Sequence, residues 1–260
     1  MEITEAQYQR IAPSLPRQRG NVRVTNLQFL NALLYVAEHG CKWRGLPKRF
    51  GPWHTIYTRM NRWSKSGVLD AVFEQLQREQ IVRIRIEAVS LDSTTVKVHP
   101  DGTGAFKKNG PQAIGKSRGG WTTKVHLVAA NARTAITFAL SPGQASDAVE
   151  GRALLAGIGP LPAPLHLIMD AAYEDNTTLQ LVLDFGYIPV VPPRHNRLDP
   201  WLLNRAMYRK RNEIERLFRR LKGFRRIFSR FEKLDVMFLG FLYFALIVEA
   251  LRFLFSVNTT

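Results

Sequence analysis

Residues 89–98, VSLDSTTVKV, mark the point at which the sequence changes from a helical pattern to a β-rich one. The β-branched and alternating apolar residues of this stretch are typical of a strand. An acid, Asp92, lies in the middle of the stretch and is followed directly by Ser93 and two threonines. A buried carboxylate is costly without a cation as its partner, so we expect Asp92 to have one.

The chain on the C-terminal side of this strand predicts a mixed α/β sheet with helices on its faces. The expected order is βββαβαβα, in which a meander of three strands precedes crossover units. The further strands are expected at 122–131, 135–143, 165–170 and 188–193, and the helices at 145–155, 175–185, 208–222 and 236–255.

A long loop rich in glycine and lysine separates the first two strands, at residues 99–120. Loops of this length are uncommon unless they are functional or disordered. Because the whole chain carries 37 Lys and Arg against 21 Asp and Glu, which favours a nucleic-acid partner, we expect this loop to become ordered on DNA and to be mobile without it, with Lys116 and Arg118 among its DNA contacts. Unchanged protease digestion and hydrogen exchange in the loop on addition of DNA would contradict that expectation.

The chain on the N-terminal side, residues 1–86, predicts a small domain of helices. Thr25 and Gly40 are the expected cap and stop of one helix, and residues 53–65 form the next. A further helix is expected after Gly67.

The helix at 53–65 has a polar face that suits a helix-turn-helix-like DNA reader. Its expected DNA contacts are Thr55, Thr58 and Arg62. The alternative is a helical bundle whose basic face is merely solvated. We therefore predict a DNA-binding domain over residues 1–86 and a second, mixed α/β domain, ending in an apolar helix, over residues 87–260.

The charge of the chain favours a polyanionic partner. Its 260 residues include 37 Lys and Arg against 21 Asp and Glu, which gives a net charge of +16. Nucleic acid is the commonest partner of such a field, and a membrane surface or an acidic protein is the weaker alternative.

The sequence also indicates a compartment. The single cysteine, Cys41, excludes an internal disulfide and fits a reducing environment. The N-terminus, MEITEAQYQR, lacks the pattern of a signal segment, so a cytoplasmic location is expected. Residues 236–255 are long and apolar enough to span a membrane, but Glu249 and Arg252 interrupt them. We expect a buried core helix there and no membrane partner.

A second acid, Asp170, ends the strand expected at 165–170. Ligand sites of open α/β sheets form at the carboxyl ends of strands, so Asp92 and Asp170 are candidates for one site. The alternative is that Asp170 only caps the helix that follows it.

A third acid lies in the most basic stretch, residues 208–222, YRKRNEIERLFRRLK. At the period of a helix, one narrow stripe beside the apolar face is shared by Tyr208, Arg211, Glu215 and Lys222. Glu213 falls on the opposite side, toward solvent. The alternative for Glu215 is ordinary ion pairing with Arg211 and Arg219, worth about 0.2–0.5 kcal/mol for each pair.

Two aspartates on strands and one glutamate on a helix can converge on divalent metal ions. Mg²⁺ prefers oxygen ligands, and a pair of such ions can activate a nucleophile and stabilise the leaving oxygen in phosphodiester displacement. The sequence has no zinc-type cluster of His and Cys and no phosphate-binding glycine loop of the Walker type.

These residues together resemble the DDE transposases of insertion sequences. Asp92, Asp170 and Glu215 stand in the order of the DDE triad. Every position of the YREK signature, Tyr-x₂-Arg-x₃-Glu-x₆-Lys, is filled, by Tyr208, Arg211, Glu215 and Lys222. The segments LDSTTVKVH, GKSRGGWTTKVH, DAAY and WRGLPKRFGPWHTIYTRMNRW are also similar to this group, so the resemblance covers nearly the whole chain.

The resemblance implies a ribonuclease H-like core that uses two Mg²⁺ ions, for which Mn²⁺ can substitute. It implies that Asp92 contacts both ions, Asp170 one and Glu215 the other. The implied activity is hydrolysis at the ends of an element, followed by attack of the freed 3′-hydroxyl on target DNA. Double-stranded DNA with terminal inverted repeats is the implied partner, bound by a homodimer or larger assembly. The side chains implied to position its phosphates are Tyr208, Arg211 and Lys222.

Three further expectations accompany this resemblance. Lys124 and His126 share a face of the strand at 122–131, where they either approach phosphates beside Asp92 or line a solvated face. Some relatives carry a β insertion between the second and third acids, but the gap here, 215 − 170 = 45 residues, predicts none. A silent DNA-binding regulator of transposition and a nuclease without strand transfer remain as alternatives, which DNA cleavage and joining would distinguish.

Overall fold

The structure, a computed structural model, describes residues 2–81 and 86–256. The chain divides into two compact units, which we call the helical unit and the sheet unit. The helical unit comprises Met1–Gln80, Val98–Gln112 and Arg220–Thr260, and the sheet unit comprises Ile81–Lys97 and Ala113–Arg219. The boundaries of these units differ from those of the predicted domains, because the C-terminal helix packs with the N-terminal helices.

The sheet unit contains a mixed sheet with β1 (Ala88–Val98) at its centre. On one side, β3 (Gly120–Asn131) is antiparallel to β1, and β4 (Thr134–Pro142) is antiparallel to β3. On the other side, β5 (Leu165–Met169) is parallel to β1, and β6 (Tyr187–Val190) is parallel to β5. The predicted βββαβαβα order and the mixed α/β fold class are confirmed.

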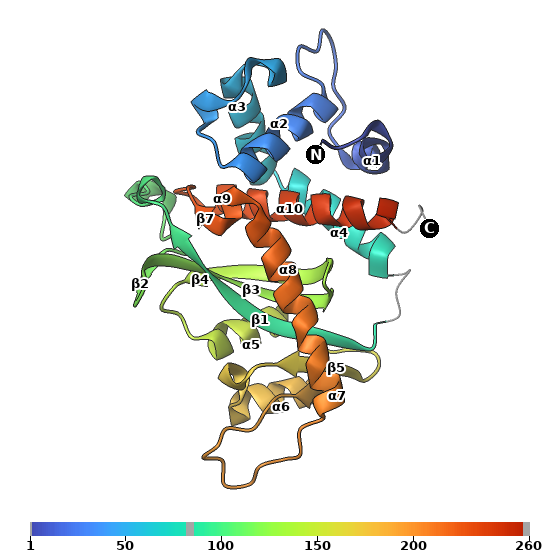
Figure 1. The fold of residues 1–260 in the computed structure, drawn as a ribbon, viewed down its shortest axis with the longest axis vertical. Coiled ribbons are helices and arrows are strands. Elements are labelled where there is room, and N and C mark those ends of the chain that lie inside the picture. Colours follow the sequence, from blue (N-terminus) through green and yellow to red (C-terminus); the bar gives the residue numbers. More distant parts are fainter. Residues whose placement is uncertain (1, 82–85, 257–260) are drawn as a thin grey trace. The chain divides into compact units, whose positions relative to one another are not determined.

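Helices lie on both faces of this sheet, as Figure 1 shows. One face is covered by α5 (Asp147–Ile158) and α6 (Asn176–Asp184). The other face carries α7 (Arg205–Tyr208) and the start of α8 (Asn212–Gly223). A short strand that the sequence did not predict, β2 (Gly115–Ser117), pairs with the start of β3 and lies within the predicted long loop.

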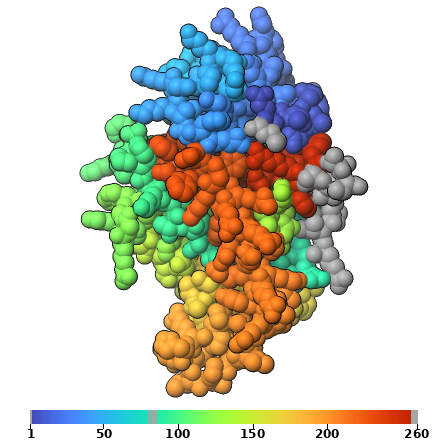
Figure 2. All heavy atoms as spheres, viewed as in Figure 1, coloured from blue at the N-terminus to red at the C-terminus, as the bar shows by residue number. Residues whose placement is uncertain are grey.

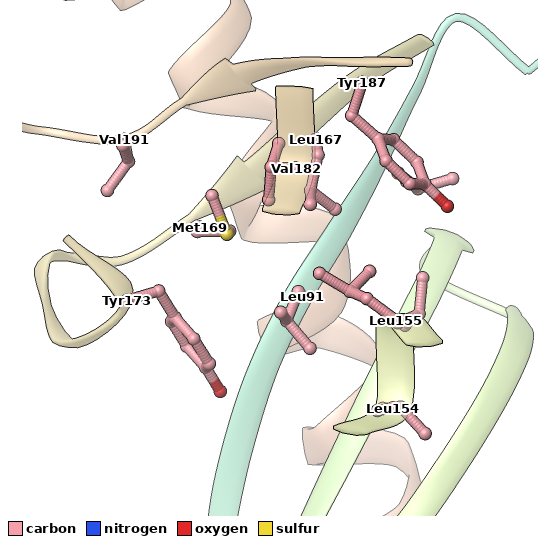
Figure 3. Packing of buried hydrophobic residues seen from close by; sticks show 11 residues of the cluster. Leu91, Leu154, Leu155, Leu167, Met169, Tyr173, Val182, Tyr187 and Val191 are labelled. Atoms are coloured by element: carbon pink, nitrogen blue, oxygen red, sulfur yellow. The ribbon is translucent and has the colours of Figure 1, made fainter. Parts of the chain in front are cut away.

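Side-chain alternation along β1 separates the two faces of the sheet. Leu91 belongs to the main buried cluster, with Leu155 of α5 and Val182 of α6 (Figure 3). Ala88 belongs to a second cluster, against which Met207 of α7 packs. Residues an even number of positions from Ala88 therefore face α7, and this set includes Asp92.

The predicted helix over residues 208–222 is present but is not continuous. α7 ends at Tyr208, a 3₁₀ turn occupies Arg209–Arg211, and α8 begins at Asn212. The Asn212 N–H donates to the Arg209 carbonyl, which tightens the chain to a 3₁₀ pattern at this point. The prediction was right about the residues and wrong about the continuity, because period alone does not reveal a local tightening.

The helical unit confirms the three predicted N-terminal helices, which are α2 (Asn26–His39), α3 (Trp53–Lys65) and α4 (Val68–Ile81). The Thr25 hydroxyl accepts a hydrogen bond from the Gln28 N–H, as expected of a cap. Gly40 ends α2 in the left-handed conformation, with φ of 65°. The elements that the sequence did not predict in this unit are α1 (Glu5–Ile11), α9 (Arg225–Phe228) and β7 (Ser229–Arg230).

The apolar C-terminal segment forms α10 (Asp235–Ser256), which is the core helix of the helical unit. It is the one helix of the described residues that is long and apolar enough to cross a membrane, and 67% of its apolar window is buried. Phe238, Phe241 and Phe244 are fully buried on it. The acid near its end, Glu249, accepts a hydrogen bond from Arg252 at 3.0 Å. Such burial and pairing are typical of the core helix of a globular unit.

A buried acid near α10 gives a prediction of pH-dependent stability. Glu232 is 5% exposed and pairs with Arg226 at 3.0 Å, and burial raises its pKa from 4.5 to about 7. Below pH 4.5 the carboxyl is protonated in both the folded and the unfolded state. As the pH rises toward 7, the unfolded state releases the proton first, so we expect the free energy of unfolding to fall by roughly 2–3 kcal/mol.

Glu232→Gln should remove this pH dependence, because glutamine keeps the shape of the side chain and cannot ionise. The measurement is urea unfolding of both proteins at pH 5 and at pH 8, with Glu5→Gln as a surface control. An equal loss of stability between the two pH values in wild type and Glu232→Gln would contradict the prediction.

Candidate active site

Asp92 lies in mid-strand on β1, on the face of the sheet that α7 covers. Its side chain is only 10% exposed. One carboxylate oxygen, Oδ1, accepts a hydrogen bond from the Ser93 N–H at 2.7 Å, and Oδ2 accepts one from Arg211 Nη2 at 2.7 Å. Burial raises the pKa of Asp92 to about 6, and the Arg211 guanidinium opposes that rise. The expected cation partner of this acid is therefore Arg211.

Asp170 lies beside Asp92 because their strands are neighbours. β1 and β5 are parallel, with Leu91 opposite Met169, and each acid follows directly after these residues. Asp170 also caps the 3₁₀ turn after β5, since its Oδ1 accepts a hydrogen bond from the Ala172 N–H at 2.8 Å. Its other oxygen, Oδ2, lies 3.9 Å from Arg211 Nη2. Asp170 therefore both caps this turn and lies beside Asp92 and Arg211.

Glu215 completes the cluster from the first turn of α8. Its Oε1 accepts a hydrogen bond from Arg211 Nη1 at 2.6 Å, so the predicted i,i+4 pair with Arg211 is present. One guanidinium therefore contacts the carboxylates of Asp92, Asp170 and Glu215. Burial acts to lower the pKa of Arg211, but the carboxylates around it outweigh that effect and raise it. We call this group the carboxylate cluster.

The chemistry of the carboxylate cluster fits a divalent metal, since three carboxylates gather around one positive charge. In their described positions, no group of three or more His, Cys, Asp or Glu side chains is arranged to hold a metal ion. The guanidinium of Arg211 stands among the acids and contacts all three. A metal bound by Asp92, Asp170 and Glu215 would have to take the place of this guanidinium.

Two members of the signature stripe lie outside the cluster itself. Tyr208 packs against the sheet beside Ala88, and burial, as the largest effect, raises its pKa. Lys222 is on the last turn of α8, where burial lowers its pKa, and it belongs to the helical unit rather than to the sheet unit. Tyr208, Arg211 and Glu215 therefore share one unit with both aspartates.

Glu213 does not simply point to solvent, as the sequence predicted. Its Oε2 accepts a hydrogen bond from the Ala132 N–H at 3.0 Å, in the turn between β3 and β4. Its other oxygen accepts one from Arg216 at 3.3 Å. Glu213 therefore attaches α8 to the sheet, on the side away from the carboxylate cluster. Helical period placed Glu213 on the opposite side of α8 from Glu215, but it could not reveal that the turn between β3 and β4 contacts this side chain.

Lys124 and His126 lie on the opposite face of the sheet from Asp92. Their strand pairs with β1 so that His126 is opposite Ser93 and Lys124 is opposite Thr95. His126 is fully buried, its Nε2 lies 2.7 Å from Ser141 Oγ, and burial lowers its pKa to about 4. Neither phosphate contact beside Asp92 nor a solvated face is compatible with these positions.

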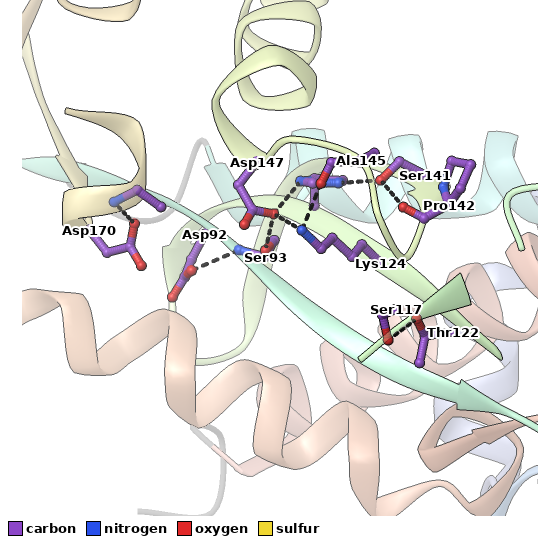
Figure 4. A network of polar contacts seen from close by, with 12 residues as sticks. Asp92, Ser93, Ser117, Thr122, Lys124, Ser141, Pro142, Ala145, Asp147 and Asp170 are labelled. Carbon is purple, nitrogen blue, oxygen red and sulfur yellow. Dashed lines mark hydrogen bonds and ion pairs between the residues drawn. The ribbon is translucent and has the colours of Figure 1, made fainter. Parts of the chain in front are cut away.

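These two side chains instead belong to a polar network around Asp147, at the start of α5 (Figure 4). Asp147 Oδ1 accepts hydrogen bonds from Ser93 Oγ at 2.7 Å and from Lys124 Nζ at 3.1 Å. The backbone N–H of the same Ser93 donates to Asp92. Asp147 is thus connected to Asp92 through a single residue of β1. Nothing in the sequence marked Asp147, because an acid in the first turn of a helix is ordinary.

The predicted DNA-binding residues of α3 lie on its outer side. Thr58 and Arg62 are exposed and Thr55 is half-buried. A groove of about 400 Å³ runs beside Thr55 and Arg62. Its rim includes three arginines that sequence reasoning did not select, Arg17, Arg19 and Arg23. The stretch RQRGNVR could have revealed them, since it holds three arginines within seven residues.

The remaining predicted DNA contacts, Lys116 and Arg118, lie at the edge of the sheet. Lys116 is in β2 and is exposed, and Arg118 is in the turn between β2 and β3. Lys116 is opposite Trp121 of β3. The C-terminal part of the predicted long loop is therefore a short hairpin rather than irregular chain.

The comparisons with known families agree with this architecture. Residues 84–248, well over half of the chain, match the family model "Transposase DDE domain". The chain therefore belongs to the DDE transposase family. Residues 3–73 match a second model, "Putative transposase of IS4/5 family". A DDE domain implies the use of a divalent metal.

Individual relatives match parts of the chain. A "Putative transposase for insertion sequence element IS6501" of Brucella ovis is 29% identical over 132 residues, which are 50% of this chain and 99% of that protein. An "Uncharacterized protein y4sN" of Sinorhizobium fredii is 34% identical over 111 residues, 42% of this chain and 86% of that protein. A piggyBac transposase, solved as a synaptic complex with hairpin DNA, has a TM-score of 0.55 and 9% identity, over 98% of this chain and 72% of that one. At that identity the likeness shows the fold, which is the ribonuclease H-like fold of transposase catalytic domains.

Proposed function

We propose that this protein moves an insertion-sequence element by binding its ends, hydrolysing a phosphodiester there, and transferring the freed 3′-hydroxyl end to target DNA. The observation that carries this proposal is the gathering of Asp92, Asp170 and Glu215 around Arg211. Three acids from two neighbouring strands and a helix converge at the carboxyl end of β5. That is a position where α/β sheets bind ligands.

In this proposal Asp92, Asp170 and Glu215 hold two Mg²⁺ ions, for which Mn²⁺ can substitute. When bound, such ions activate the attacking oxygen and stabilise the leaving oxygen of the phosphodiester. Asp92 is the most buried of the three acids, so it is fixed most firmly by its surroundings. Arg211, once displaced from the carboxylates, is available to bind a DNA phosphate, as are Tyr208 and Lys222.

The proposed DNA contacts of the helical unit are Thr55, Thr58 and Arg62, together with the arginines on the rim of their groove. Lys116 and Arg118 are proposed contacts of the sheet unit. A net charge of +16 supports binding that is strong and sensitive to salt. We propose a cytoplasmic protein that acts as a homodimer or larger assembly on DNA, because two element ends must be brought together.

The test uses duplexes made from the DNA that flanks this gene, searched for inverted repeats. Wild type and Asp92→Asn are incubated with these duplexes and a plasmid target, in Mg²⁺, in Mn²⁺ and in EDTA. We expect wild type to cleave the duplex and join it to the plasmid in either metal, and neither reaction in EDTA or with Asp92→Asn. Equal activity of Asp92→Asn would contradict the proposal.

One observation favours a second candidate, a DNA-binding regulator without catalysis. In the described structure the guanidinium of Arg211 occupies the position among the three acids that a metal ion would take. The same assay separates the two candidates. Tight, salt-sensitive binding without cleavage in either metal would favour the regulator, and cleavage without joining would favour a nuclease.

The network around Asp147 gives a prediction for a positioning residue. Asp147→Ala would free the Ser93 hydroxyl and leave the ammonium of Lys124 without its carboxylate, so β1 would be held less firmly beside Asp92. We expect end cleavage to slow roughly tenfold with DNA affinity unchanged. The measurement is the single-turnover cleavage rate together with the Kd for the same duplex.

Glu150→Ala is the matched control, because Glu150 also lies in the first turn of α5. Asp147→Asn should recover most of the rate, since an amide oxygen can still accept the Ser93 hydrogen bond. A purely structural role would lower the folded fraction without slowing cleavage by the folded protein. Equal rates for Asp147→Ala and Glu150→Ala would rule out the positioning role.

A further inference from the structure

The segment between β6 and α7, residues 191–204, carries two leucines whose side chains are entirely in solvent. Leu198 is 102% exposed and Leu202 is 99% exposed. Figure 1 shows this segment extending away from the sheet between α6 and α7, and Figure 2 shows it at the surface. Burial of a leucine side chain stabilises a protein or a complex by about 1.5–3 kcal/mol. Two fully exposed leucines on one short segment are therefore a candidate contact surface, whose surroundings decide whether a partner is implied.

These leucines are exposed although the segment that carries them is held in place by Trp201. Between them lies Trp201, whose Nε1 donates a hydrogen bond to the Val191 carbonyl at 2.8 Å. The Trp201 ring packs against the main buried cluster of the sheet unit. The guanidinium of Arg197 lies 4.5 Å from the centre of that ring. The tryptophan points inward and is fixed, and the leucines on both sides of it point outward.

The segment is also attached to the turn that carries one acid of the carboxylate cluster. Arg194 Nε donates to the Ala171 carbonyl at 3.4 Å, and Ala171 directly follows Asp170. Arg197 pairs with Glu174 and donates to Asn176 Oδ1 at 2.9 Å. A phosphodiester that reaches Asp170 would therefore lie next to this segment.

The charge around the leucines selects the kind of partner. The segment and its boundary with α7 contain the cations Arg194, Arg197 and Arg205 against a single acid, Asp199, and Glu174 from the turn after β5 pairs with Arg194 and Arg197, which leaves a net positive charge. Proteins that kink duplex DNA place cations beside exposed apolar side chains. The cations contact phosphates, and the apolar side chain enters between base pairs as a wedge. A second copy of the chain fits less well, since a twofold contact would bring the same arginines together.

We propose that Leu198 and Leu202 insert into duplex DNA beside the phosphodiester at the carboxylate cluster and unstack a base step there, while Arg194 and Arg205 hold the adjacent phosphates. This inference rests on the proposed function, because it places the scissile DNA at the cluster. It assigns the segment the task of opening the duplex where the reaction occurs.

The test measures the permanganate reactivity of thymines in the end duplex, in Ca²⁺ so that the DNA stays intact. The proteins are wild type, the double variant Leu198→Ala/Leu202→Ala, and Leu183→Ala as the control. Leu183 is a 54% exposed leucine on α6 of the same unit. We expect wild type and Leu183→Ala to make thymines near the scissile phosphate reactive, and the double variant to lose roughly four-fifths of that reactivity.

End cleavage in Mg²⁺ should slow about tenfold in the double variant, and Leu198→Met/Leu202→Met should restore it because methionine is also an apolar wedge. Equal permanganate reactivity of the double variant and wild type would overturn the inference. A change of oligomeric state in solution without a change in DNA reactivity would also overturn it, in favour of a second copy. Wild type that unstacks the duplex but never cleaves it would count against the proposed function alone. Wild type that cleaves without any unstacking would count against the wedge alone.

Discussion

Glu215→Gln is expected to lower the rate of end cleavage by about a thousandfold or more, and Glu213→Gln to change it by less than about threefold. The two acids are two positions apart on one helix, and both lie in a strongly basic stretch. Only Glu215 reaches Arg211, and through it the two aspartates of the carboxylate cluster. Glutamine has the size of glutamate but no negative charge with which to bind a metal ion. The loss of cleavage activity would therefore be chemical rather than steric.

Glu213→Gln is a close control because its own structural role survives the substitution. The amide oxygen of glutamine can still accept the hydrogen bond from the Ala132 N–H. Cleavage is measured under single-turnover conditions with saturating protein, alongside the Kd for the same duplex. Full activity of Glu215→Gln together with loss of activity in Glu213→Gln would reverse the assignment.

Much of the fold could be predicted from the sequence because local signals agreed with the tertiary structure. Thr25 and Gly40 bound α2 as cap and stop, and the strand pattern around Asp92 gave β1 and the mixed sheet. The break before Asn212 could not be predicted, because a single 3₁₀ turn hardly changes the helical period of the sequence. The helix α1 could not be predicted either, because two turns are too few to show a helical period.

The candidate site was predictable in its acids and much less so in their surroundings. Asp92 was selected by its position within a strand, Asp170 by the end of its strand and Glu215 by helical period, and the structure brings all three to Arg211. The prediction for His126 was wrong because the sequence does not reveal the register between β1 and β3. His126 is opposite Ser93, and it therefore lies on the face of the sheet away from Asp92. Asp147 escaped notice because an acid in the first turn of a helix is ordinary, and because its partners, Ser93 and Lys124, come from β1 and β3.

Arg211→Ala is expected to lower the free energy of unfolding of the metal-free protein by about 3 kcal/mol at pH 7.5. The substitution leaves Asp92, whose side chain is 10% exposed, without its cation and beside Asp170. The Glu215 contact adds little to that loss, because Glu215 is 47% exposed and solvent screens its charge. Arg216→Ala is the control, since Arg216 is 54% exposed and pairs only at 3.3 Å, and it should cost less than about 0.5 kcal/mol.

The same variant distinguishes a metal site from a structural ion pair, without any measurement of activity. If the carboxylates are metal ligands, Arg211 competes with the metal for them, and its removal should favour metal binding. Urea unfolding in EDTA and in millimolar Mn²⁺ would then show a larger stabilisation by Mn²⁺ in Arg211→Ala than in wild type or Arg216→Ala, because a ligand that binds only the folded state stabilises it. A loss of stability that Mn²⁺ does not relieve would mean that Arg211 pairs with these acids for structural reasons alone. The argument for a catalytic cluster would then have to rest on cleavage by the wild type.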